Sequence, residues 1–410
     1  MKRIIAFFLA VLLLFTFIGC SNHSQTEDNS AEILSQRRDQ VESYMRSMAT
    51  VLWRATEDII YSNSSQNTDP TTNMNDLTYI RAGRLYQGLP YSHAAGGPNA
   101  FLEYAGVPDE KGIYPISGLT WHSLNGTNAT ARIGNDCASA VGLSWGQLGN
   151  SLVQDSNTKY MTIQYGYLRV GEYESNEDAH TYTYPVCEAN GFEVMAAAYA
   201  KLQKADAVVR RNQLDNNGHA MLVVSVHVDR TDDGTISGAS SYITVLEQTS
   251  GTIENELCSY DAELGENVYK TYYIDKKYTF FDLFSAGYLP ITCKELVDPS
   301  PVVEESVTDS LTEYNKSNIF SGTLTSTRFI ESTTIQITDS AGNTVQSCTA
   351  SPTNRQLYTF NLEVFQTDRP EVLRGSIDLN DLSPGTYHCI VICRLITGSS
   401  FAVRDFSFVV

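Results

Sequence analysis

In the stretch ARIGNDCASAVGLSWGQL, residues 131–148, one cysteine stands where thiol chemistry would be favoured. Cys137 follows Gly-Asn-Asp and leads into small and apolar residues that can form a short helix, with Asn135 and Asp136 as cap residues. A thiol attacks a carbonyl as the thiolate, and both a helix N-terminus and a nearby imidazole favour that anion. Cys137 is therefore a candidate nucleophile, and the alternative is a buried, inert thiol.

One of the seven histidines is best placed to serve as the base. His219 begins an expected strand, 218–228, directly after the turn-forming stretch DNNG, so we expect it at the rim of a sheet. His227 lies in the same strand, where a role on an exposed face is equally favoured. The other histidines fall in expected loops, the N-terminal segment or the last part of the chain: His23, His93, His122, His180 and His388.

A catalytic histidine is oriented by a third polar side chain, and the partner strand expected at 241–249 supplies two candidates. If the hairpin loop is 232–234 with a glycine bulge, His219 faces Glu247; if the loop is only Asp233-Gly234, it faces Gln248. The apolar pattern favours the second register, and a bulge in SGASS would reverse that preference. The residues alone leave both candidates open.

The remaining periodicity predicts the elements that must position these side chains. Apolar residues recur at helical spacing from Glu32 to about Tyr61, with Trp53 on the flank of the helix. Residues 151–187 are polar and aromatic and read as an insertion. The other expected elements are a helix at 191–205 and a strand at 206–209.

These stretches resemble a known group of enzymes. NDCASAV is similar to the Asp-Cys-Ser-Gly motif of NlpC-like cysteine peptidases, and ADAVV with GHAMLVV resembles their strands. GHAMLVVSV, DDGTI and ITVLEQT are also similar to CHAP amidases, in which a glutamate completes the site. The resemblance covers about residues 77–296. It implies an α+β papain-like (NlpC-like/CHAP) fold that acts on bacterial peptidoglycan.

Carried onto this chain, the resemblance implies a role for each matching residue. Cys137 matches the nucleophile, His219 the base and Glu247 the orienting group. Tyr86, in YQGLPYS, is similar to a tyrosine near the oxyanion position, so we expect it to bind substrate; ordinary packing is the alternative. No metal and no organic cofactor is expected.

Three positions depart from the pattern of these families. Ala138 replaces the usual Ser or Thr after the cysteine, Ala205 replaces Gly in the Gly-Asp pair, and Thr249 stands where CHAP amidases have Asn. None removes the nucleophile or the base. They weaken the transfer of bond specificity.

The N-terminus has the layout of an export signal. MKRIIAFFLAVLLLFTFIGC contains two basic residues, a short apolar run and Gly19-Cys20. Its end resembles a bacterial lipobox, although Phe17 stands where Leu is usual, and this implies a signal peptide at 1–20 with lipidation of Cys20. The alternative is an uncleaved anchor. Residues 21–31 are polar and read as a tether, so the rest of the chain faces outward from a membrane.

The net charge and the cysteine content argue against several classes of partner and of metal site. The formal net charge of −19 argues against nucleic acid and against an anionic membrane surface. Without Cys20, seven cysteines remain, so at least one thiol stays free if the others pair. No CxxC pair occurs, which argues against a zinc ribbon.

The sequence predicts a second domain in the last part of the chain. Residues 297–310 have the composition of a linker after a hydrolase domain at 32–296, and 311–410 alternate with regular turn signals. This predicts an all-β immunoglobulin-like sandwich. With the resemblance, we expect an exported, lipid-anchored cysteine hydrolase that cleaves an amide bond in peptidoglycan as endopeptidase or amidase. The alternatives are a non-catalytic surface binding or adhesion lipoprotein and a thiol acyltransferase.

Overall fold

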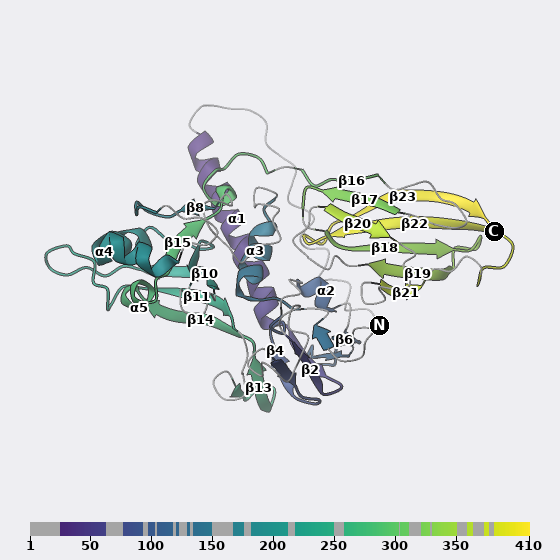
Figure 1. Ribbon diagram of the computed structural model, residues 1–410, viewed down its shortest axis with the longest axis horizontal. Helices are drawn as coiled ribbons and strands as arrows, with labels where there is room; N and C mark the ends of the chain where they lie inside the picture. The colour runs from purple at the N-terminus through teal and green to yellow at the C-terminus, as the bar shows by residue number, and fades with distance from the viewer. Residues whose placement is uncertain are drawn as a thin grey trace.

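The computed structural model defines a mixed α/β protein in which strands outweigh helices (Figure 1). It describes residues 25–62, 77–92, 97–102, 105–117, 120–122, 129–131, 134–149, 167–175, 182–211, 218–249, 258–302, 304–310, 321–328, 330–350, 359–363, 373–376 and 381–410. The expected signal peptide, with Cys20, lies outside these residues. Among the described helices, none is both long enough and apolar enough to cross a membrane.

The first described element is a long helix, α1 (Gln25–Thr50). Its inward face carries Val41, Met45 and Met48, all fully buried, as the helical spacing predicted. The expected limits of this helix are wrong at both ends. It begins inside the segment expected to be a tether, 21–31, and it ends before Tyr61.

After α1 the chain becomes extended instead of remaining helical. Strand β1 (Leu52–Ala55) lies between β4 and β5, and β2 (Ile59–Ser62) pairs with β3. Trp53, expected on the flank of a helix, is fully buried in β1 and donates its ring N–H to the Gly88 carbonyl at 2.8 Å. Pairing on both sides of β1 therefore overrides the helical spacing of its apolar residues.

A six-stranded sheet carries the residues that the sequence singles out. Its strand order is β14-β11-β10-β9-β15-β8, and each pair of neighbours is antiparallel. The strands expected at 206–209, 218–228 and 241–249 are confirmed as β9, β10 and β11. The bounds are β8 (Leu168–Arg169), β9 (Ala207–Arg211), β10 (Gly218–His227), β11 (Tyr242–Gln248), β14 (Tyr272–Thr279) and β15 (Leu289–Thr292).

Three helices accompany this sheet: α3 (Cys137–Gly146), α4 (Thr183–Tyr199) and α5 (Phe280–Ser285). The helix expected after Cys137 is confirmed, and it packs between α1 and β10. The helix expected at 191–205 begins earlier and ends earlier, so the expected insertion, 151–187, runs into it. Gly191 joins its two halves with φ 77°, a left-handed conformation that glycine adopts without strain.

Two smaller sheets use the strands between α1 and α3 and those before β14. Their orders are β12-β13-β4-β1-β5 and β3-β2-β7-β6. Only Thr271 separates β13 from β14, so one stretch of chain joins a small sheet to the six-stranded one. The bounds are β3 (Leu77–Ile80), β4 (Leu85–Gln87), α2 (Pro98–Leu102), β5 (Tyr114–Ile116), β6 (Thr120–His122), β7 (Ala129–Ala131), β12 (Cys258–Asp261) and β13 (Glu266–Lys270).

The last part of the chain forms two further sheets around their own core. Their orders are β16-β17-β20 and β21-β19-β18-β22-β23, and apolar side chains of both sheets share one cluster. Strand β16 lies inside the expected linker, 297–310. The bounds are η3 (Lys294–Leu296), β16 (Val307–Asp309), β17 (Ser321–Ser326), β18 (Ile330–Thr338), β19 (Thr344–Ala350), β20 (Thr359–Glu363), β21 (Leu373–Ser376), β22 (Thr386–Leu395) and β23 (Ser400–Val409).

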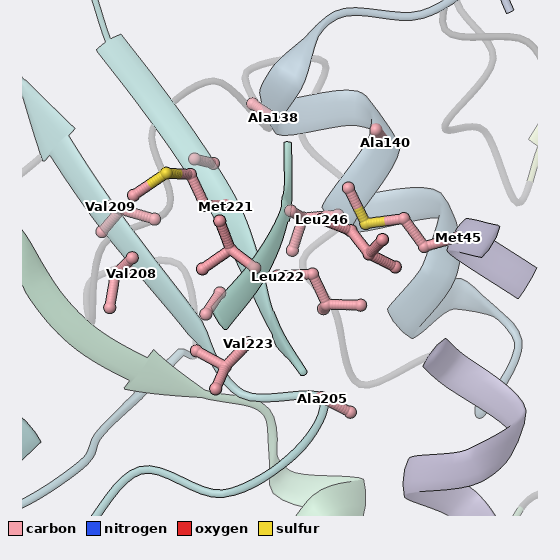
Figure 2. Packing of buried hydrophobic residues seen from close by; sticks show 14 of the residues in the cluster. Met45, Ala138, Ala140, Ala205, Val208, Val209, Met221, Leu222, Val223 and Leu246 are labelled. Atoms are coloured by element: carbon pink, nitrogen blue, oxygen red, sulfur yellow. The ribbon is translucent and has the colours of Figure 1, made fainter. Parts of the chain in front are cut away.

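The main core lies between the six-stranded sheet and the helix pair α1 and α3. Figure 2 shows Met45 of α1 beside the sheet residues Leu222 and Leu246, all three without solvent exposure. Burial of each such side chain contributes about 2 kcal/mol. Ile396 of the C-terminal part also joins this core, and its carbonyl accepts a hydrogen bond from Gln147 at 3.4 Å. The two cores therefore meet beside the C-terminal end of α3.

Candidate active site

Cys137 is the first residue of α3 and is itself buried, with 7% of its surface exposed. Asp136 caps the helix: its carboxylate accepts the Ser139 N–H at 2.7 Å, and the Ser139 hydroxyl accepts the Asp136 N–H at 2.8 Å. This capping box leaves the N–H groups of Cys137 and Ala138 without a partner among the described residues. Two such N–H groups beside a thiol are suited to stabilise an oxyanion.

The loop before Cys137 is fixed by buried hydrogen bonds around Asn135. The Asn135 side-chain oxygen accepts the Tyr272 hydroxyl at 2.7 Å, and its backbone carbonyl accepts the Gln248 amide at 3.3 Å. Gly134 precedes it with φ 118°, and a Cβ there would collide with the Pro90 carbonyl. The close approach of these two loops therefore requires glycine and sets where α3 begins.

The structure brings His219 and Glu247 together with Cys137. His219 is the second residue of β10, and its Nε2 lies 2.9 Å from Oε1 of Glu247 on β11. Both side chains are largely buried, with exposed fractions of 16% and 7%. Because Nε2 is held by Glu247, Nδ1 is the ring nitrogen that remains for Cys137.

The β10–β11 hairpin begins in the first of the two expected registers. The Thr231 N–H bonds to the Thr235 carbonyl at 2.9 Å, so the loop is 232–234. The pairing then slips. In the register of the turn, His227 would face residue 239. It faces Tyr242 instead, a slip of three residues, because SGASS (237–241) adds residues to one strand.

A second irregularity in the same pair of strands reduces this slip by one residue, from three to two. A bulge lies between Val223 and Ser225, after which Leu222 faces Leu246. The net slip of two residues is even, so Glu247 remains on the face of the sheet that carries His219. Glu247 is a diagonal neighbour of His219 rather than the residue directly opposite, and both expected registers are wrong in detail.

Gln248, the alternative orienting group, points to the other face. It is fully buried, and its side-chain amide donates to the carbonyls of Leu89 at 3.1 Å and Asn135 at 3.3 Å. Gln248 therefore supports the loop that precedes Cys137 and does not contact His219.

Electrostatics favour a charged pair at this site. Burial alone lowers the pKa of His219, but the Cys137 thiolate and the hydrogen bond to Glu247 outweigh it and raise that pKa to about 9. Burial raises the pKa of Glu247, but His219, Tyr278 and Lys276 together lower it to about 2. At neutral pH His219 is therefore protonated, and its partner Glu247 is ionised.

Two residues that sequence analysis did not single out hold the second oxygen of Glu247. The Tyr278 hydroxyl donates to Oε2 at 2.7 Å, and the Lys276 ammonium lies 3.1 Å from the same atom. Both lie on β14, the neighbour of β11 in the sheet. In the sequence, residues 276–296 are recognisable only as an aromatic-rich segment, so no pattern there predicts a role at the site.

Tyr288 and Arg210 extend the site along the sheet, and sequence analysis also missed them. The ring centre of Tyr288 lies 6.4 Å from that of His219, edge to face. The Arg210 guanidinium lies 5.3 Å from the centre of the Tyr288 ring. Arg210 is paired with His219 across β9 and β10, so strand pairing alone predicts this proximity once the order of the strands is known.

Tyr86, the residue expected to bind substrate, lies in β4 of a smaller sheet. Its ring stacks on Trp53 with centres 4.7 Å apart, and its hydroxyl accepts the Arg81 N–H at 2.7 Å. Only 4% of its surface is exposed. These contacts are those of a packed core residue, and a role in substrate binding remains a prediction.

The departure at Ala205 has a visible conformational cost. Ala205 has φ 69°, in the region that glycine adopts freely, and its carbonyl accepts the ring N–H of Trp145 at 2.7 Å. Asp206, which follows, is buried and forms an ion pair with Arg38 of α1 at 2.9 Å. Burial raises the pKa of Asp206. This pair of residues therefore fastens α1 and α3 to the sheet.

The remaining cysteines and histidines take no part in this cluster. All seven cysteines of the described residues carry free thiols, and no group of three or more metal-ligating side chains gathers among those residues. His227 stacks on Tyr242 with ring centres 4.8 Å apart. His23, His93 and His180 lie outside the described residues, as does the side chain of His122.

No protein-family model matches the chain, and no curated protein sequence matches it significantly.

Proposed function

We propose that the chain is a cysteine hydrolase that cleaves an amide bond through Cys137, His219 and Glu247. The observation that carries the proposal is the joint placement of a thiol at a helix N-terminus and a buried imidazole held by a carboxylate at 2.9 Å. The order of nucleophile, base and carboxylate along the chain is that of the resemblance at 77–296. This order supports a papain-like domain. The two sheets that share one core in the last part of the chain support an immunoglobulin-like domain after it.

The reaction follows from the protonation states at the site. The Cys137 thiolate attacks the amide carbonyl, and the N–H groups of Cys137 and Ala138 bind the resulting oxyanion. His219, protonated because its pKa is raised to about 9, donates its proton to the leaving amine. The acyl group then forms a thioester with Cys137. Water attacks this thioester, gives a proton to His219 and releases the carboxylic acid.

The substrate is proposed to be a peptide amide of peptidoglycan. The likeness of NDCASAV, GHAMLVV and ITVLEQT to NlpC-like peptidases and CHAP amidases supports this choice. The lipobox-like ending at Cys20 supports a lipid anchor that keeps the enzyme at the membrane, facing the cell wall.

The test uses the full chain, purified in detergent, with defined muropeptides as substrates and mass spectrometry of the products. We expect cleavage by the wild type and by Cys258→Ala, a matched control because Cys258 is a half-exposed thiol away from His219. Cys137→Ala should lose activity by on the order of 10⁴-fold or more. The masses of the fragments identify the bond.

Absence of cleavage by a folded wild type whose Cys137 also resists alkylation would contradict the proposal. The alternative hypothesis, a non-catalytic binding lipoprotein, would then be favoured. Addition of an acceptor amine separates hydrolysis from acyl transfer, because a transferase forms a new amide product.

A further inference from the structure

The face of the sheet that carries His219 also presents a cation, Arg210, that has no carboxylate partner in the part of the chain that the structure describes. Arg210 of β9 lies directly opposite His219 of β10, so both side chains leave the sheet on the same face, with Cβ atoms about 5 Å apart. Arg210 is exposed, whereas His219 is largely buried. The guanidinium therefore lies at the rim of the site, next to the catalytic imidazole.

Arg210 differs from the other cations of the site in its partners. Lys276 is matched by Glu247 at 3.1 Å, and His219 by the same carboxylate at 2.9 Å. No carboxylate of the described residues lies within ion-pair distance of Arg210. The one described contact of its side chain is the ring of Tyr288. The ring holds the guanidinium in place but leaves its N–H groups available to a ligand.

The Tyr288 hydroxyl provides a second donor at the same place. Burial raises the pKa of Tyr288 and outweighs the lowering by Arg210, while Glu247 and Cys137 raise it further, so the hydroxyl stays protonated at neutral pH. It has no hydrogen-bond partner among the described residues. Tyr288 thus lies near both Arg210 and the reactive thiol, and its hydroxyl is available to donate a hydrogen bond to a ligand.

We propose that Arg210 and Tyr288 form a carboxylate-binding subsite beside Cys137 and His219. The substrate therefore carries a free carboxylate close to the amide that is cleaved, and the guanidinium binds it through charge-assisted hydrogen bonds while the phenol donates a further one. This inference rests on the proposed hydrolysis and specifies its substrate class. Carboxylate binding at this position holds the neighbouring carbonyl over the thiol.

The experiment compares one set of synthetic stem peptides in two forms, with their carboxylates free or converted to carboxamides. We expect the wild type to cleave the free-acid form with at least about tenfold higher kcat/KM, because a charge-assisted hydrogen bond contributes about 1.5–3 kcal/mol. Arg210→Gln should lower kcat/KM for the free-acid form about tenfold, mainly through KM. It should leave the carboxamide form nearly unchanged. Tyr288→Phe should act in the same direction with a smaller effect.

The control is Arg230→Gln, which removes an exposed cation at the far end of the β10–β11 hairpin, about 36 Å of extended strand from His219. It should leave both rates unchanged. Equal cleavage of the two peptide forms by the wild type, or an equal loss of both in Arg210→Gln, would overturn the subsite and leave the hydrolase standing. A folded wild type that cleaves neither form would overturn both.

Discussion

Two regions of this molecule each contain a cysteine, a histidine and a carboxylate. In the first, His219 contacts Glu247 at 2.9 Å next to Cys137. In the second, on β22 and β23, His388 contacts Asp405 at 2.8 Å and is followed directly by Cys389. The histidine–carboxylate distance is almost the same in the two places, although the second pair is far more exposed.

The difference lies in which way the thiol points. Cys389 is adjacent to His388 in one strand, so the two side chains leave on opposite faces, and Cys389 lies in the apolar core with no exposure. Burial, with a contribution from Asp405, raises the pKa of Cys389 to about 12. Cys137 instead comes from a helix N-terminus that faces the imidazole. The three residue types therefore form a site only where the fold turns them toward one another.

The largest expected difference between the two thiols is in their rates of alkylation. With a pKa of about 12, Cys389 carries only about 10⁻⁵ of its population as thiolate at pH 7. We expect iodoacetamide to modify Cys137 at least about 10³-fold faster, measured by peptide mass spectrometry of the native protein. His219→Ala should slow the modification of Cys137 and leave Cys389 as it was. Equal rates at the two thiols would show that the helix end and imidazole do not activate Cys137.

A second test uses pH, because the charge on His219 contributes to folding. Its pKa rises from about 6.5 in the unfolded chain to about 9 in the folded one. The folded state binds this proton more tightly, so the stabilisation is complete below about pH 6.5 and is lost as the pH rises through 9.

The expected size of that effect is about 3 kcal/mol at most. In urea unfolding between pH 6 and pH 10, the difference in unfolding free energy between the wild type and His219→Gln should be largest at the acidic end and shrink toward pH 10. A difference that stays constant across this range would contradict the charged pair.

The smallest expected effect comes from the support of Glu247. Tyr278→Phe removes the hydroxyl that donates to Oε2 at 2.7 Å and should lower kcat for muropeptide cleavage about tenfold, with little change in KM. Tyr242→Phe, at the opposite end of β11 from Glu247, is the matched control and should have no effect. A fall in thermal stability without a fall in kcat would assign Tyr278 to packing alone.

Local signals in the sequence were sufficient for several elements of the site. The cap at Asp136, the small residues after Cys137 and the alternation in β10 and β11 each act within a few residues, and the structure has the elements they predict. The helix expected as far as Tyr61 failed because strand pairing of β1 with β4 and β5 is not visible in local spacing.

The rest of the site depends on contacts between distant segments. Tyr278 reaches it from β14, and Tyr288 reaches it from the position just before β15. The neighbours of these strands in the sheet cannot be read from a single sequence. The choice between Glu247 and Gln248 required two irregularities, in SGASS and beside Val223, to be known together. Sequence alone therefore singled out Cys137, His219 and two candidates for the polar side chain that contacts the imidazole.

The two irregularities of the β10–β11 hairpin compensate each other, because together they shift the pairing by an even number of residues. One extra residue in SGASS, without a compensating change elsewhere in the paired strands, would turn the carboxylate of Glu247 away and present the amide of Gln248 to His219. The paired strands between these two residues can therefore gain or lose length in even steps only. Deletion or duplication at this hairpin is constrained by parity, even though its tip is fully exposed.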